Sequence, residues 1–113
     1  MGSSGHAIRL GRLFDAETGR SFVTAIDHGV TIGVPTGAEN IIATLEKVIA
    51  GEPDAVLVSP GTMDKAGHVF ARRGAPSPIV RCDWIINDPY INDLGEGYRA
   101  LITPSRVDCS CFA

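Results

Sequence analysis

Three short apolar segments recur along the chain at nearly regular spacing, and this repetition limits the possible folds more than any other feature. The segments span residues 21–26, 54–58 and 79–83, so their starts lie roughly 25 to 32 residues apart. Each gap has room for one helix. Consecutive strands that are joined by single helices form right-handed βαβ units with a parallel sheet. The sequence therefore predicts an α/β fold.

The first gap carries a helix signal. Thr36-Gly37-Ala38-Glu39 matches a capping box, in which the Thr and Glu side chains bind the first free amides of a helix. Apolar residues then repeat at helical spacing until Gly51 and Pro53, which end the pattern. We therefore expect a helix over 38–50, with Glu46 and Lys47 outside its apolar stripe. The stripe consists of Ile41, Ile42, Leu45, Val48 and Ile49.

The second gap predicts a further helix over 62–73. Ser59-Pro60-Gly61 is typical of an exit loop after a buried strand, and Thr62 is a suitable cap for the helix that follows. Arg72 and Arg73 suit the carboxyl end of that helix because cations interact favourably with its dipole, and His68 is expected on its surface. After the third strand, residues 87–97 have loop composition, and residues 98–102 fit either a short strand or the approach to a helix.

Titratable side chains follow two of the three strands. Asp27 and His28 end the first strand, which as an apolar strand is expected to be buried on both faces, and Asp83 ends the third, followed by Trp84. Folds of this class place their chemistry at the carboxyl ends of the strands. Asp27 is therefore the first candidate for a working residue. A structural alternative stays open for each position, since Asp often caps a loop and Trp often packs in a core.

Composition excludes several other classes of function. The 113 residues include 10 basic and 13 acidic side chains, and the arginines are scattered, so no nucleic-acid-binding face is expected. The apolar runs are too short to span a membrane and no secretion signal is recognisable, which predicts a cytoplasmic protein with a loose amino terminus over residues 1–6. Cys82 is expected to be a buried thiol. Cys109 and Cys111 lack two further ligands at metal-site spacing, so no metal site is expected.

Several motifs, in this order and spacing, resemble the amino-terminal part of the archaeal-type (DhnA-type) class I fructose-bisphosphate aldolases, within the DeoC/LacD group of Schiff-base aldolases. The resemblance covers roughly residues 8 to 104. The matching motifs are Ile8-Arg9-Leu10, Arg12-Leu13-Phe14, Thr18-Gly19-Arg20, Ala25-Ile26-Asp27-His28-Gly29, Asp54-Ala55-Val56, Ser59-Pro60-Gly61, Val80-Arg81-Cys82-Asp83-Trp84 and Tyr98-Arg99-Ala100-Leu101-Ile102.

The resemblance implies a (β/α)8 TIM barrel, a fold of about 250 residues, of which this sequence would supply about three βα units. It divides the chain into a lead segment (1–20), a partial barrel (21–104) and an aberrant or truncated tail (105–113). It also implies a lyase that cleaves or forms a carbon–carbon bond in a phosphorylated ketose without a cofactor. Asp27 would lie beside the imine-forming lysine, and His28 would contact substrate or handle protons. Ser59, Asp83 and Trp84 are the candidate substrate-binding residues.

The sequence also departs from this family. The imine-forming lysine of the family lies on the sixth barrel strand and its phosphate site follows strands seven and eight, whereas the lysines of this chain are Lys47 and Lys65. A second interpretation is therefore a non-catalytic, truncated barrel. Such a fragment exposes a sheet edge and an apolar face, which predicts self-association, for example as a homo-oligomer.

Overall fold

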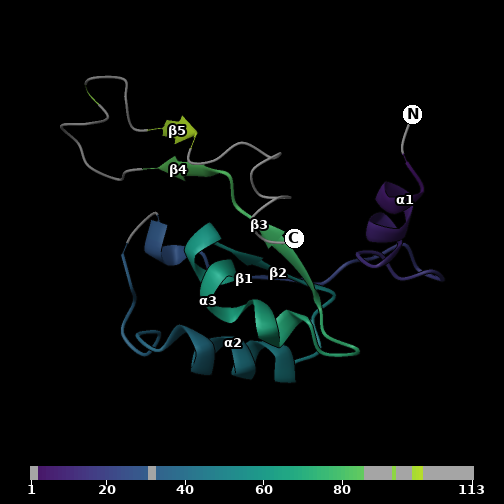
Figure 1. Cartoon of the computed structure of the whole chain (residues 1–113), viewed down its shortest axis with the longest axis horizontal. Helices are drawn as coiled ribbons and strands as arrows, with labels where there is room; N and C mark the ends of the chain where they lie inside the picture. The colour runs from purple at the N-terminus through teal and green to yellow at the C-terminus, as the bar shows by residue number, and fades with distance from the viewer. Residues whose placement is uncertain (1–2, 31–32, 86–92, 94–97, 101–113) are drawn as a thin grey trace.

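The structure is a computed structural model of the chain, and it describes residues 3–30, 33–85, 93 and 98–100. Figure 1 shows the arrangement of its helices and strands. The elements in chain order are α1 (Ser4–Gly11), β1 (Val23–Ala25), the 3-10 helix η1 (His28–Val30), α2 (Ile41–Ala50), β2 (Ala55–Val58), α3 (Pro60–Phe70), β3 (Ser77–Val80), β4 (Asp83–Ile85) and β5 (Tyr98–Ala100).

The first three strands form one parallel sheet in the order β1-β2-β3, which confirms the predicted α/β class and strand direction. The register pairs Ala25 with Leu57 and Leu57 with Ile79. Two further bonds continue the ladder at the carboxyl edge, because the amides of Ile26 and Arg81 donate to the carbonyls of Leu57 and Val58, both at 2.9 Å. All three strands therefore point their carboxyl ends to the same edge.

Helices α2 and α3 lie on the same side of this sheet (Figure 1) and form the core with it. Leu45 of α2, Val69 of α3, and Val56 and Val58 of β2 are fully buried. Each such side chain contributes about 1.5–3 kcal/mol through removal of apolar surface from water. The amphipathic stripe predicted for the first helix is thus confirmed at Leu45.

On the opposite face of the sheet, strand β1 is exposed. The register places Val23, Ala25, Leu57 and Ile79 on this face, and Val23 is 44% exposed. The prediction that the first strand is buried on both faces is therefore wrong. The physical reason is that β1 is an edge strand, and the helices that pack on this sheet cover its other face.

The capping box predicted at Thr36 is also wrong. Helix α2 begins at Ile41, and its cap is Asn40, whose side-chain oxygen accepts a 3.1 Å hydrogen bond from the amide of Ala43. Glu39 instead accepts a bond from the amide of Gly37 at 2.9 Å. Because its carboxylate stabilises this preceding turn, the helix starts three residues later than the sequence predicted. Its end at Ala50, with Gly51 as the cap, agrees with the prediction.

The predicted exit loop at Ser59 is instead the beginning of α3. The hydroxyl of Ser59 accepts a 3.2 Å bond from the amide of Thr62, and Pro60 occupies the first helical position, where its missing N–H costs nothing. The prediction of Thr62 as the cap is therefore wrong. Thr62 is a buried residue of the first turn, and the helix ends at Phe70, three residues before the predicted end.

The third strand ends earlier than expected. It stops at Val80, and Asp83 opens β4, which pairs with β5 in an antiparallel manner. Of the two alternatives for residues 98–102, the structure has a short strand at Tyr98–Ala100. Most of the predicted loop at 87–97 and the whole tail at 105–113 lie outside the described residues, as do Cys109 and Cys111.

The amino-terminal segment is more ordered than its sequence indicated. Residues from Ser4 form helix α1, which is capped by the hydroxyl of Ser3 through the amide of His6 at 3.3 Å, and no residue of α1 is buried. The expectation of a loose terminus is thus wrong for these residues. The helix rests on local capping and not on tertiary packing. Among the described helices, none has the length and apolar character needed to cross a bilayer.

Candidate functional site

A cavity of about 420 Å³ opens at the carboxyl edge of the sheet. Asp27 and His28, which follow β1, line it together with residues from the first turns of α2 and α3. Ser59 contributes to the same wall. The parallel strands β1 and β2 thus bring Asp27 and Ser59 to the same edge of the sheet.

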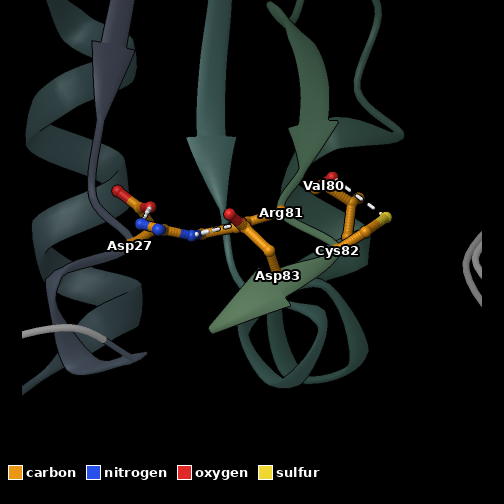
Figure 2. A network of polar contacts seen from close by, with 5 residues as sticks. All are labelled: Asp27, Val80, Arg81, Cys82 and Asp83. Carbon is orange, nitrogen blue, oxygen red and sulfur yellow. Dashed lines mark hydrogen bonds and ion pairs between the residues drawn. The ribbon is translucent and has the colours of Figure 1, made fainter. Parts of the chain in front are cut away.

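Asp27 is the most buried charged side chain of the cavity wall. The residue is 7% exposed, and its Oδ2 accepts a hydrogen bond of 2.7 Å from Nη1 of Arg81. Burial of a carboxylate is costly unless it is paired and hydrogen-bonded, so the guanidinium explains how a charged Asp27 is tolerated here. Figure 2 shows the Arg81 side chain extending toward Asp27 across the end of the sheet.

Arg81 binds a second carboxylate as well. Its Nε lies 2.7 Å from Oδ1 of Asp83, and the Arg81 side chain is 17% exposed (Figure 2). The hydrogen bonds to Asp27 and then to Asp83 raise the pKa of Arg81 above its ordinary value, despite the opposing effect of burial. The guanidinium is thus permanently charged and links the ends of β1 and β3 across β2.

The remaining predicted site residues have different environments. His28 begins η1, is exposed and lines the cavity. The hydroxyl of Ser59 is already used, since it donates to Oγ1 of Thr62 at 3.0 Å and accepts from the Thr62 amide. The backbone of Trp84 pairs with Arg99 in the β4–β5 ladder, but its side chain lies outside the described part of the structure. Asp83 is connected to the site by its ion pair with Arg81, which also binds Asp27.

Two residues of this region were not predicted from the sequence. Arg81 is a charged residue inside an otherwise apolar segment, Ile79-Val80-Arg81-Cys82, and this interruption was the signal that could have identified it. Lys65 lies on α3 and lines the same cavity as Asp27. No sequence pattern identified Lys65 as a residue of this site, because its position at the cavity results from the packing of α3 against the sheet.

Within the described ranges, no three His, Cys, Asp or Glu side chains gather in an arrangement that could hold a metal ion. Cys82 is a free, half-buried thiol, and its Sγ contacts the carbonyl of Val80 at 3.7 Å (Figure 2). The titratable groups that line the described cavity are therefore two carboxylates, those of Asp27 and Glu39, together with an imidazole and an ammonium. Such groups can bind hydroxyls and transfer protons.

Comparisons with known proteins point to one group. The chain is 37% identical over 79 residues to an uncharacterized aldolase of Saccharolobus solfataricus, a match that covers 70% of this chain and 28% of that protein. It is 38% identical over 80 residues to the 2-amino-3,7-dideoxy-D-threo-hept-6-ulosonate synthase of Halobacterium salinarum, with 71% and 28% covered. These similarities support an aldolase family for this chain.

The similarity to aldolases is partial in extent. The chain matches a little over a quarter of the length of these two relatives, and no family model matches it. The parallel strands and the helices between them are compatible with one part of a TIM barrel.

Proposed function

We propose that this chain is part of a class I, Schiff-base aldolase related to the fructose-bisphosphate aldolases, acting on a phosphorylated ketose. In this proposal the β1-β2-β3 sheet with α2 and α3 is the amino-terminal portion of a (β/α)8 barrel. Its carboxyl edge carries the active site, as in TIM-barrel enzymes generally. That the substrate is a small molecule is inferred from the aldolase relatives, and that it is a phosphorylated ketose is inferred from the sequence resemblance.

The observation that carries the proposal is the position of Asp27. It follows β1 at the carboxyl edge, lines a cavity of about 420 Å³, and is held by Arg81 at 2.7 Å. The Arg81 bond occupies Oδ2. A carboxylate that is fixed on one oxygen can use the other to accept a hydrogen bond from a substrate hydroxyl.

This geometry suits the proton transfers of an aldol cleavage. When the carbon–carbon bond breaks, the hydroxyl on the departing carbon loses its proton and becomes a carbonyl, while the bonding electron pair moves into an iminium formed with a lysine amine. Asp27 is proposed as the group that accepts this proton or orients that hydroxyl. His28 is proposed to contact substrate or handle protons, and Ser59, Asp83 and Trp84 to shape the binding site.

A second candidate function is a non-catalytic barrel segment, and it is favoured by the environment of the lysines. An imine-forming lysine needs a desolvated or otherwise activated amine. Lys47 and Lys65 are both exposed, and neither lies on a strand. For this polypeptide alone we therefore propose no aldolase activity, with the active site completed only in a full barrel.

One experiment tests the role of Asp27 in an aldolase. The matching segment of the Halobacterium salinarum synthase is replaced by that of this chain, and product formation by the chimera is measured. We expect activity, and a loss of about 100-fold or more for Asp27→Asn, which is the usual scale of acid–base catalysis. Asp64→Asn is the matched control because Asp64 is an exposed carboxylate on α3. Equal activity of the two variants would contradict the proposal.

A second experiment tests the chain alone. The purified protein is incubated with fructose 1,6-bisphosphate and borohydride, and each lysine is examined by peptide mass spectrometry. We expect no cleavage and no reduced adduct. A stoichiometric adduct on Lys65 would overturn the non-catalytic interpretation, because Lys65 lines the cavity that contains Asp27.

A further inference from the structure

We propose that Lys65 binds the anionic group of a substrate molecule in the cavity, at the α3 wall, while Asp27 receives the hydroxyl-bearing part of the same molecule. The proposal rests on the proposed function for the nature of the molecule, a phosphorylated polyol. The binding site itself is argued from the charges that line the cavity.

Lys65 has no carboxylate partner among the residues that the structure describes. In the part of the chain that the structure describes, the ion pairs join Arg72 to Glu46 and Arg81 to Asp27 and Asp83, and none includes Lys65. The side chain is exposed at the cavity wall. It can therefore bind an incoming anion without first breaking an internal salt bridge.

The carboxylates of the cavity wall are engaged elsewhere. Asp27 is bound by Arg81, and the carboxylate of Glu39 accepts hydrogen bonds from its own amide and from that of Gly37, which hold the pKa of Glu39 below its usual range. Glu39 is therefore ionised near neutral pH. Neither carboxylate is paired with Lys65 in the described structure.

The cavity wall therefore carries negative charge at Asp27 and Glu39 and positive charge at Lys65. Arg81 divides its charge between Asp27 and Asp83, so the Asp27 end remains a hydrogen-bond acceptor that disfavours anions. At the α3 wall, Lys65 is joined by Gly61, which lies in the first helical turn, where backbone N–H groups lack partners within the helix. A molecule with hydroxyls at one end and a phosphate at the other matches this polarity.

The size of the cavity agrees with a ligand of this class. Small-molecule sites usually enclose about 300–1,000 Å³, and the cavity volume here is about 420 Å³. A neutral polyol would satisfy the Asp27 end alone and leave Lys65 solvated. The structure thus predicts that the anionic group adds affinity specifically through Lys65.

The test compares the two lysines of the chain, which serve as site and matched control. Fructose 6-phosphate, fructose and inorganic phosphate are each titrated into the full chain by calorimetry. Lys65→Gln is expected to weaken fructose 6-phosphate binding by up to about fivefold, the scale of a solvent-exposed charge pair, without affecting fructose. Lys47→Gln should have no effect, because Lys47 is exposed on α2 and does not line the cavity.

A second measurement does not depend on the variants folding. The wild-type chain is acetylated under limiting conditions, and the modified fractions of Lys65 and Lys47 are compared by mass spectrometry. Fructose 6-phosphate and inorganic phosphate should protect Lys65 but not Lys47, and fructose should protect neither. Equal protection of both lysines, or none at Lys65, would overturn the proposal.

These readouts are separate from catalysis. An inactive synthase chimera together with protection of Lys65 would contradict the aldolase role and leave the anion site standing. An active chimera without protection of Lys65 would support the aldolase role and reject the anion site.

Discussion

Nη1 of Arg81 lies 2.7 Å from Oδ2 of Asp27, although 54 positions separate the two residues in the chain. Asp27 follows β1 and Arg81 follows β3, and β2 lies between these strands in the sheet. The ion pair therefore connects the two outer strands of the sheet at the edge where the cavity opens.

Removal of the guanidinium should destabilise the protein. Arg81→Met leaves Asp27 buried without its charged partner, and breaking a pair of this kind costs on the order of 3 kcal/mol. The free energy of unfolding is measured by urea denaturation. Arg73→Met is the control, since Arg73 is exposed, and it should change stability by less than about 0.5 kcal/mol. Similar losses for the two variants would show that the ion pair does not stabilise the sheet.

The start of α2 can be tested by mutating its actual and its predicted caps. Asn40→Ala removes the acceptor of the Ala43 amide and should destabilise the protein by about 1 kcal/mol. Thr36→Ala should have little effect, because Thr36 is exposed and lies outside the helix. Thermal unfolding followed by circular dichroism compares the two. A larger effect at Thr36 would restore the capping box and contradict the observed helix start.

The Glu46–Arg72 pair predicts a pH effect of defined sign. The bidentate hydrogen bonds of Arg72, at 2.7 and 2.9 Å, lower the pKa of Glu46 from its ordinary value of 4.5. Because the folded pKa is lowered, the pair stabilises the protein above about pH 4.5, and this contribution is lost as the pH falls through the lowered value.

Carboxyl-carbon NMR titration measures this pKa directly. Arg72→Gln should return the pKa of Glu46 toward 4.5, whereas Arg73→Gln should leave it unchanged. Added salt should reduce the difference, since both side chains are exposed and screened by ions. A Glu46 pKa that does not respond to Arg72→Gln would rule out the pair in solution.

The open face of the sheet predicts self-association of the isolated chain. On this face Val23 is 44% exposed, and Ala25 and Leu57 continue its apolar surface; the neighbouring Phe22, just before β1, is 57% exposed. We expect oligomers or low solubility, together with an unfolding transition of low cooperativity. Phe22→Ser combined with Val23→Thr should shift the sedimentation profile toward monomer. A monomeric wild-type chain with a sharp thermal transition would instead indicate a self-sufficient small α/β domain.

The parallel direction of the sheet strands could be predicted from the sequence. Short apolar segments at regular spacing, with one amphipathic stretch in each gap, leave few topologies other than consecutive βαβ units. The same reasoning placed Asp27 at the carboxyl edge of the sheet. These features depend on the local hydrophobic pattern, which is present in the sequence itself, and on the right-handed crossover connection, which parallel βαβ units adopt in general.

The positions at which helices begin, and the residues that lie near Asp27, depended on tertiary structure. The side chains of Thr36 and Asn40 are both of types that cap helices. Asn40 is the cap in the structure, because Glu39 stabilises the turn before it. Arg81 and Lys65 reach the Asp27 region because β3 lies two strands from β1 and because α3 packs on the sheet. The periodicity of a sequence does not report contacts between residues so far apart in the chain. Burial and charge pairing in the folded structure determine these contacts.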